Sequence, residues 1–163
     1  MWRTFGVHEP IWAFVYDTTV LHLSGSRGAC PLGRFTEPRI EPEIVDTIAD
    51  WALHGALLIG EPQSVERLGP DILSRLERFT VSLLCDGTVR DMGRSANALG
   101  SPLDAVAHLM AVLVKQPEAK ALQAGELVTT GTLTLARPIR AGETWSTVLE
   151  GIALPGMSVE FGH

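Results

Sequence analysis

Three glutamates recur in the stretch 37–44, which reads Glu-Pro-Arg-Ile-Glu-Pro-Glu-Ile. In an extended segment, side chains two positions apart lie on one face, so Glu37, Glu41 and Glu43 share a face with Arg39. Neighbouring carboxylates repel each other, and hard divalent ions such as Mg²⁺, Mn²⁺ and Ca²⁺ prefer oxygen ligands of this kind. The stretch therefore indicates either a divalent-cation site or a solvated acidic edge strand in which Arg39 is the counter-charge.

Two prolines stiffen the same stretch and exclude a helix. Pro38 and Pro42 lack a backbone N–H group and hold φ near its extended value. Because such a strand cannot donate at these positions, it is confined to the edge of a sheet. With the glutamates on one face, Ile40 and Ile44 face the other way, and we expect both to enter a hydrophobic core.

The composition is that of an ordinary globular protein. The chain has 163 residues, of which 45% are hydrophobic and 20% charged, which suits one domain with a substantial core. No apolar run reaches membrane-spanning length, so we expect no membrane partner. The net charge of −6, without a Lys/Arg cluster, argues against nucleic acid, because phosphate contacts need many positive charges.

The cysteines and the first residues indicate the compartment. Cys30 and Cys85 are too few and too far apart for a disulfide framework or a zinc site, so we expect free thiols in a reducing cytoplasm. Residues 1–6 have neither the basic region nor the apolar core of a secretory signal. Both observations predict a cytoplasmic protein.

Turn and cap residues delimit the expected elements. Asp86-Gly87 is typical of a tight type I′ hairpin, and Ser101-Pro102 is a well-formed helix start. Apolar spacing predicts helices over 44–54, after Pro70 and after Ser101, with a loop over 24–31. The expected strands are 11–23, 56–59, 80–85, 88–91, 127–135, 143–149 and 157–161.

Four further residues could take part in a site. His8-Glu9 forms either a general acid/base pair or a pair in a surface loop. Arg94, in a loop of small residues at 92–100, either binds an acidic substrate or points into water. Gly131 interrupts a strand rich in threonine, which indicates a bulge or a backbone that something approaches closely.

Five segments of the chain carry a resemblance to a known family. Arg-Ile-Glu-Pro-Glu-Ile at 39–44 resembles the metal-binding Glu-x-Glu signature of the fumarylacetoacetate hydrolase superfamily, in particular its 2-keto-4-pentenoate hydratases and 4-oxalocrotonate decarboxylases. The segments 6–20, 53–60, 97–102 and 124–134 resemble further landmarks of that branch, in the same order. The resemblance covers nearly the whole chain.

The resemblance implies a fold and a site. The implied fold is α+β, a β-rich mixed roll of the fumarylacetoacetate hydrolase type with flanking helices, in a single domain over residues 1–163. The implied cofactor is Mg²⁺ or Mn²⁺, with Glu41 and Glu43 as two of three carboxylate ligands. In the family this ion chelates a 2-oxo acid and acts as a Lewis acid. Gly131 and Thr132 match positions near the bound acid and are the candidate substrate-binding residues.

The sequence also departs from the family. Counterparts of an N-terminal region with an active-site lysine and of a central insert with the third carboxylate are missing, so we expect a shortened domain. Asp46 or Asp50 could replace that ligand, although aspartates on a helix surface are usually solvated. A site with two carboxylates would be completed largely by water and would bind Mg²⁺ more weakly.

The implied activity is that of a divalent-metal-dependent hydratase, a hydro-lyase, acting on a short unsaturated 2-oxo acid. Decarboxylation and C–C hydrolysis are the alternatives within the superfamily. A further alternative is a non-catalytic reduced relative, a binding or partner subunit that takes metal ligands across an oligomer interface. Relatives commonly form homo-oligomers, which we also expect here. No catalytic side chain is assigned.

Overall fold

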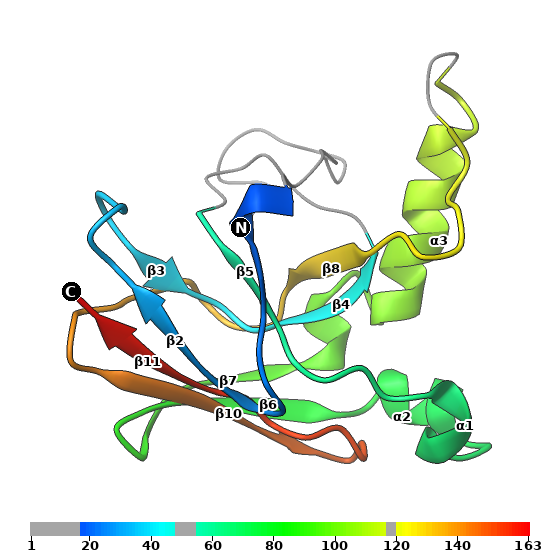
Figure 1. Cartoon of the computed structure of the whole chain (residues 1–163). Coiled ribbons are helices and arrows are strands. Elements are labelled where there is room, and N and C mark those ends of the chain that lie inside the picture. Colours follow the sequence, from blue (N-terminus) through cyan, green and yellow to red (C-terminus); the bar gives the residue numbers. More distant parts are fainter. Residues whose placement is uncertain (1–16, 48–54, 117–119) are drawn as a thin grey trace.

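Short strands make up most of the molecule, and helices flank them (Figure 1). The structure is a computed structural model and describes residues 17–47, 55–116 and 120–163. Its strands are β1 (Val20–His22), β2 (Arg27–Pro31), β3 (Arg39–Ile40), β4 (Glu43–Thr47), β5 (Leu57–Ile59), β6 (Thr80–Cys85), β7 (Thr88–Arg94), β8 (Val128–Thr132), β9 (Arg137–Pro138), β10 (Thr144–Glu150) and β11 (Ser158–Gly162).

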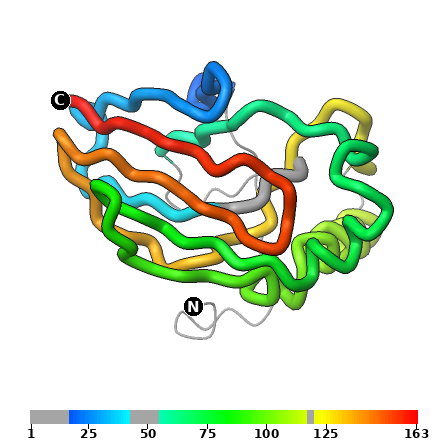
Figure 2. Tube along the Cα trace, turned by 90° about the horizontal axis from the view of Figure 1, so that it is seen from below, coloured from blue at the N-terminus to red at the C-terminus, as the bar shows by residue number. Residues whose placement is uncertain are grey.

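The largest sheet has five strands in the order β2-β11-β10-β6-β7. Its pairs are antiparallel except that β2 runs parallel to β11. Figure 2 shows these segments side by side, seen from below. Burial alternates along β6, where Val81, Leu83 and Cys85 are buried and their neighbours are partly exposed. One face of the sheet therefore covers a core, as the period of two in a strand requires.

Three short strand pairs form a second layer, above the large sheet in Figure 1. They are the parallel pair β1-β5 and the antiparallel pairs β3-β9 and β4-β8. The main core cluster joins Leu83, Trp145 and Phe161 of the large sheet to partly buried Ile40 and Leu58 of the short strands. The two layers thus share one core, and the expected β-rich mixed roll with flanking helices is confirmed.

The helices are α1 (Val65–Leu68), α2 (Ile72–Leu76) and α3 (Pro102–Leu113). The start predicted for the longest one is confirmed, because the Ser101 side chain accepts a hydrogen bond from the Asp104 N–H at 3.2 Å. Leu109 and Leu113 of α3 pack against Val128 of β8. Among the described helices, none has both the length and the apolar character needed to cross a bilayer.

The predicted hairpin is confirmed at Asp86-Gly87. Both residues have positive φ, 49° and 76°, as a type I′ turn requires. The Asp86 carboxylate also accepts a hydrogen bond from the Thr144 N–H at 2.9 Å, so the turn is tied to β10. Asp86 is therefore a turn residue, as predicted.

Two of the expected elements were wrong. The helix predicted over 44–54 begins instead as strand β4, which pairs with β8, while 48–54 lie outside the described residues. The loop predicted over 24–31 contains β2, which pairs with β11. In both cases the partner strand is distant in the sequence, and long-range pairing outweighed the local pattern. His8-Glu9 also lies outside the described residues.

A partly buried ion pair ties β7 to the second layer. The Asp91 carboxylate accepts hydrogen bonds from Arg137 Nε and Nη2, at 3.0 and 2.6 Å, and from the Leu135 N–H at 3.2 Å. Burial acts to raise the pKa of Asp91. The hydrogen bonds from Arg137, Met92 N–H and Leu135 N–H outweigh burial and hold this pKa below its ordinary value of 3.8.

We expect Asp91→Asn to lower the free energy of unfolding at pH 7 by about 2 kcal/mol, because a charge-assisted hydrogen bond is lost. The lowered pKa makes the contribution of Asp91 complete well above pH 3.8. It disappears as pH falls through the folded-state pKa, since the unfolded chain binds the proton first. Urea unfolding of both proteins at pH 7 and pH 3 should show the difference shrinking in acid. A difference independent of pH would contradict this assignment.

Candidate metal centre

The acidic stretch runs from a bend at Glu37 through β3 to the start of β4, and its residues alternate in exposure. The side chains at 37, 39 and 41 are exposed, whereas Pro42 is buried and Ile40 packs partly buried against the main core. Ile40 thus lies on the inner side, as expected. Glu43 is placed by its backbone as the first residue of β4. The backbone of Glu41, Pro42 and Glu43 therefore runs along the surface of the second layer.

The partner of this stretch is the segment that carries Gly131 and Thr132. Glu43 lies opposite Thr132 in the pairing of β4 with β8. The Leu133 N–H donates a hydrogen bond of 3.1 Å to the Pro42 carbonyl, between the two glutamates. Glu43 and Thr132 are 89 positions apart in the sequence and are thus neighbours in the fold. Three of the four candidate positions lie on the adjacent strands β4 and β8, and Glu41 lies in the connection between β3 and β4.

A bulge lies at Gly131. Between Glu43 and Val45 the chain advances two residues, whereas the paired segment from Thr132 to Thr129 advances three. Gly131 has a φ of 97°, which other residues rarely adopt, and a Cβ built on it would meet no atom within 4 Å. The backbone beside Glu43 is therefore open to close approach, and the predicted bulge is confirmed.

The Thr132 hydroxyl already donates its proton in a hydrogen bond within the protein. It donates a hydrogen bond of 2.7 Å to the Thr134 carbonyl, and the Thr132 side chain is half-buried. A hydroxyl has one donor and two acceptor lone pairs. In this arrangement Thr132 therefore offers a ligand an oxygen acceptor and no donor.

The two glutamates of this stretch offer the kind of oxygen ligand that a hard cation binds. In the part of the chain that the structure describes, no three His, Cys, Asp or Glu side chains converge on one point. Glu41, in the connection between β3 and β4, and Glu43, the first residue of β4, nevertheless lie two positions apart, next to the segment with the open Gly131. Carboxylate oxygens are what Mg²⁺ and Mn²⁺ prefer, so these residues fit two ligands of such an ion. Of the alternative third ligands, Asp46 lies in β4 and Asp50 lies outside the described residues.

The two cysteines do not offer a nucleophile. Both are buried and free of disulfides. Burial raises the pKa of the Cys30 thiol, against the opposing effect of Arg34. Burial also raises the pKa of Cys85, and the negative charges of Glu143 and Asp86 add to this effect. Protonated thiols are poor nucleophiles, so both cysteines act as core residues.

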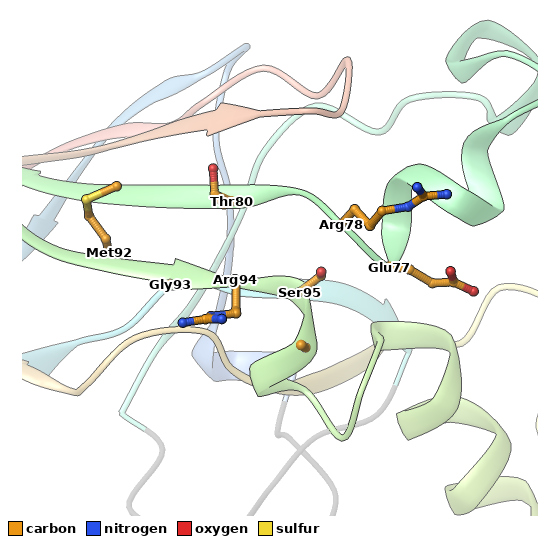
Figure 3. Close-up of a pocket in the computed structure, with 8 residues that line it drawn as sticks. Glu77, Arg78, Thr80, Met92, Gly93, Arg94 and Ser95 are labelled. Carbon is orange, nitrogen blue, oxygen red and sulfur yellow. The ribbon is translucent and has the colours of Figure 1, made fainter.

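A shallow pocket of about 400 Å³ lies where α2 ends and β7 leaves the sheet. Arg78 and Arg94 line it, but Figure 3 shows their guanidinium groups pointing in opposite directions. Two cations that diverge do not clamp one acidic group. The loop predicted over 92–100 was wrong at its start, because Arg94 is the last residue of β7 and pairs with Thr80 of β6. Arg94 is exposed, which agrees with the second of its two expected roles, a side chain in water.

Comparison with known proteins gives a consistent result. No protein-family model matches the chain. It is 31% identical over 127 residues to 2-keto-4-pentenoate hydratase 2 of Dechloromonas aromatica, which covers 76% of this chain and 46% of that protein. The chain thus spans about half the length of this curated relative. Its fold matches that of 4-oxalocrotonate decarboxylase from Pseudomonas putida G7, complexed with magnesium and adipate, at a TM-score of 0.79 and 21% identity over 98% of this chain and 73% of that one.

The predicted resemblance to the fumarylacetoacetate hydrolase superfamily is confirmed. A further match is fumarylpyruvate hydrolase from Pseudomonas aeruginosa, in complex with Mn²⁺ and pyruvate, with a TM-score of 0.66 and 16% identity over 99% of this chain and 84% of that one. These structures support the superfamily fold.

Within this superfamily fold, one contact was missed by the sequence reasoning. The Asn97 side-chain amide donates a hydrogen bond of 2.7 Å to the carbonyl of Leu133, the residue that also holds Pro42. Asn97 begins the segment 97–102, one of those that resemble the superfamily. Its partner, 36 residues away, could not be inferred from the sequence.

Proposed function

We propose that this chain forms a divalent-metal site for a short 2-oxo acid and that its reaction is the hydration of an unsaturated 2-oxo acid. The observation that carries the proposal is the pairing of Glu43 with Thr132, next to Glu41 and the open bulge at Gly131. Decarboxylation and C–C hydrolysis are alternatives with the same ligands. The named relatives support all three reactions, since they include a hydratase, a decarboxylase and a hydrolase.

Each residue has a distinct part in this proposal. Glu41 and Glu43 would hold Mg²⁺ or Mn²⁺, and the bound ion would supply a Lewis acid that polarises the keto oxygen of the acid. Gly131 lets the substrate approach the strand, because no side chain occupies that position. Thr132 would accept a hydrogen bond from a bound water or hydroxyl, since its own proton is directed at Thr134.

A second candidate function is a non-catalytic binding or partner subunit. It is favoured by the lack, among the described residues, of three metal-ligating side chains that converge. In that case the remaining ligands would come from another chain, which agrees with the homo-oligomer that we propose.

We also propose that residues 1–163 form a single domain, as the core shared by the two strand layers suggests.

The test uses pyruvate as a small 2-oxo acid. We expect Mn²⁺ to bind the protein and the line width of the pyruvate methyl signal in NMR to increase more with protein and Mn²⁺ together than with either one alone. We also expect Mg²⁺-dependent consumption of 2-keto-4-pentenoate that stops when EDTA is added. Binding without consumption would favour the partner subunit. A protein that binds neither Mn²⁺ nor pyruvate would overturn the proposal.

A further inference from the structure

We propose that Asn97 is a positioning residue that sets the placement of the two candidate metal ligands. This inference rests on the function proposed above. The Asn97 amide donates to the Leu133 carbonyl at 2.7 Å, and the Leu133 N–H donates to the Pro42 carbonyl at 3.1 Å. Pro42 stands between Glu41 and Glu43. Two hydrogen bonds in series therefore connect Asn97 to the backbone that carries both carboxylates.

Leu133 can pass a displacement of Asn97 on to Pro42 because the Leu133 backbone is itself held rigidly. Its side chain is 1% exposed and packs with Phe79 and Val81 in a core cluster. On the other side, Gly93 of β7 lies so close to the Leu133 carbonyl that a Cβ there would overlap it. With the side chain packed and both peptide groups bonded, the Leu133 backbone has little freedom to move.

Asn97 stands on a turn that is fixed to the large sheet. The turn is the 3₁₀ segment Ser95–Asn97, which follows β7, and Figure 3 shows Ser95 where it leaves that strand. The Ser95 N–H donates to the Phe79 carbonyl at 3.0 Å, and Ser95 and Ala98 are buried. Asn97 thus connects the five-stranded sheet to the layer that carries the acidic stretch.

The acidic stretch needs such an anchor because its own pairing is irregular. The ladder of β4 with β8 has register shifts on both sides of Val45. β3 contributes only two residues, Arg39 and Ile40, to its pair with β9. Between these pairs, Pro42 is held to the opposite strand through Leu133. Metal ligands must be held within about 0.5 Å of their working geometry, so a shift of the backbone at Pro42 would weaken the binding of an ion by Glu41 and Glu43.

The test is Asn97→Ala, compared with Asp86→Ala. Asp86 lies in the turn before β7, at the end of the hairpin away from Asn97, where its carboxylate accepts from the Thr144 N–H and from Cys85 Sγ, so its loss also removes side-chain hydrogen bonds. Two quantities are measured, the dissociation constant for Mn²⁺ and the exchange rate of the Leu133 amide hydrogen. We expect Asn97→Ala to weaken Mn²⁺ binding about tenfold, as residues that support metal ligands do, and to speed Leu133 exchange. We expect Asp86→Ala to change neither.

The outcomes separate this inference from the proposed function. If wild-type protein binds Mn²⁺ and Asn97→Ala binds it equally well, the positioning role is overturned. Equal losses of Mn²⁺ affinity in Asn97→Ala and Asp86→Ala would assign the effect to general stability and would also overturn that role. If wild-type protein binds no Mn²⁺, the proposed function fails, and Leu133 exchange then reports only whether Asn97 holds this strand.

Discussion

Glu41→Gln is expected to weaken Mn²⁺ binding about 100-fold while leaving the fold intact. Glutamine keeps the shape of the side chain but removes the negative charge, which is the main attraction for a divalent ion in a site with only two carboxylates. A 100-fold loss corresponds to about 2.7 kcal/mol of binding free energy. Glu41 is exposed, so its replacement should have little effect on the free energy of unfolding. Titration followed by Mn²⁺ electron paramagnetic resonance measures the affinity.

The matched control is Glu37→Gln. Glu37 is exposed and belongs to the same acidic stretch, but it lies at a bend before β3, four residues from Glu41. The two variants lose the same charge, so a general electrostatic effect would lower both affinities alike. Weak and identical Mn²⁺ binding by wild-type protein and Glu41→Gln would remove Glu41 from the site. The acidic stretch would then be the solvated edge strand of the alternative interpretation.

Gly93→Ala is expected to destabilise the protein by about 3 kcal/mol. A Cβ at this position would lie 2.7 Å from the carbonyl carbon of Leu133, closer still to its oxygen, and 3.1 Å from Thr134 Cγ2. The obstacle is backbone, so it cannot rotate away as a flexible side chain would. Moving the Leu133 carbonyl would also weaken its hydrogen bond with Asn97. Thermal unfolding should show Tm lower by roughly 10 °C.

Gly162→Ala in β11 serves as the control. A Cβ on Gly162 would meet no atom within 4 Å, and its φ is not in the left-handed region. We expect a change in the free energy of unfolding of no more than about 0.5 kcal/mol. If the two alanine variants had equal Tm values, the close approach of β7 to Leu133 would be wrong. The placement of Asn97 would then need to be reconsidered as well.

Local signals in the sequence predicted the features that depend on a few neighbouring residues. Asp86-Gly87 indicated a turn with positive φ at both positions, and Ser101 indicated a helix start, because both depend on local backbone geometry. Gly131 indicated a bulge for the same reason. The helix predicted from Ile44 was wrong over 44–47 because Ile44 and Val45 fit a helical stripe and a strand equally well, and only the pairing with β8 decides between them.

The sequence by itself determined which side chains of the acidic stretch share a face. Pro38 and Pro42 exclude a helix, and the exposure of the side chains alternates as expected from Glu37 to Pro42, although Glu37 itself lies at a bend. Only the tertiary structure decided which residues lie opposite the acidic stretch. The pairing of Glu43 with Thr132 and the contacts of Leu133 with Pro42 and Asn97 join segments that are far apart in the chain. Such contacts follow from how the two strand layers close on a shared core, which no local pattern encodes.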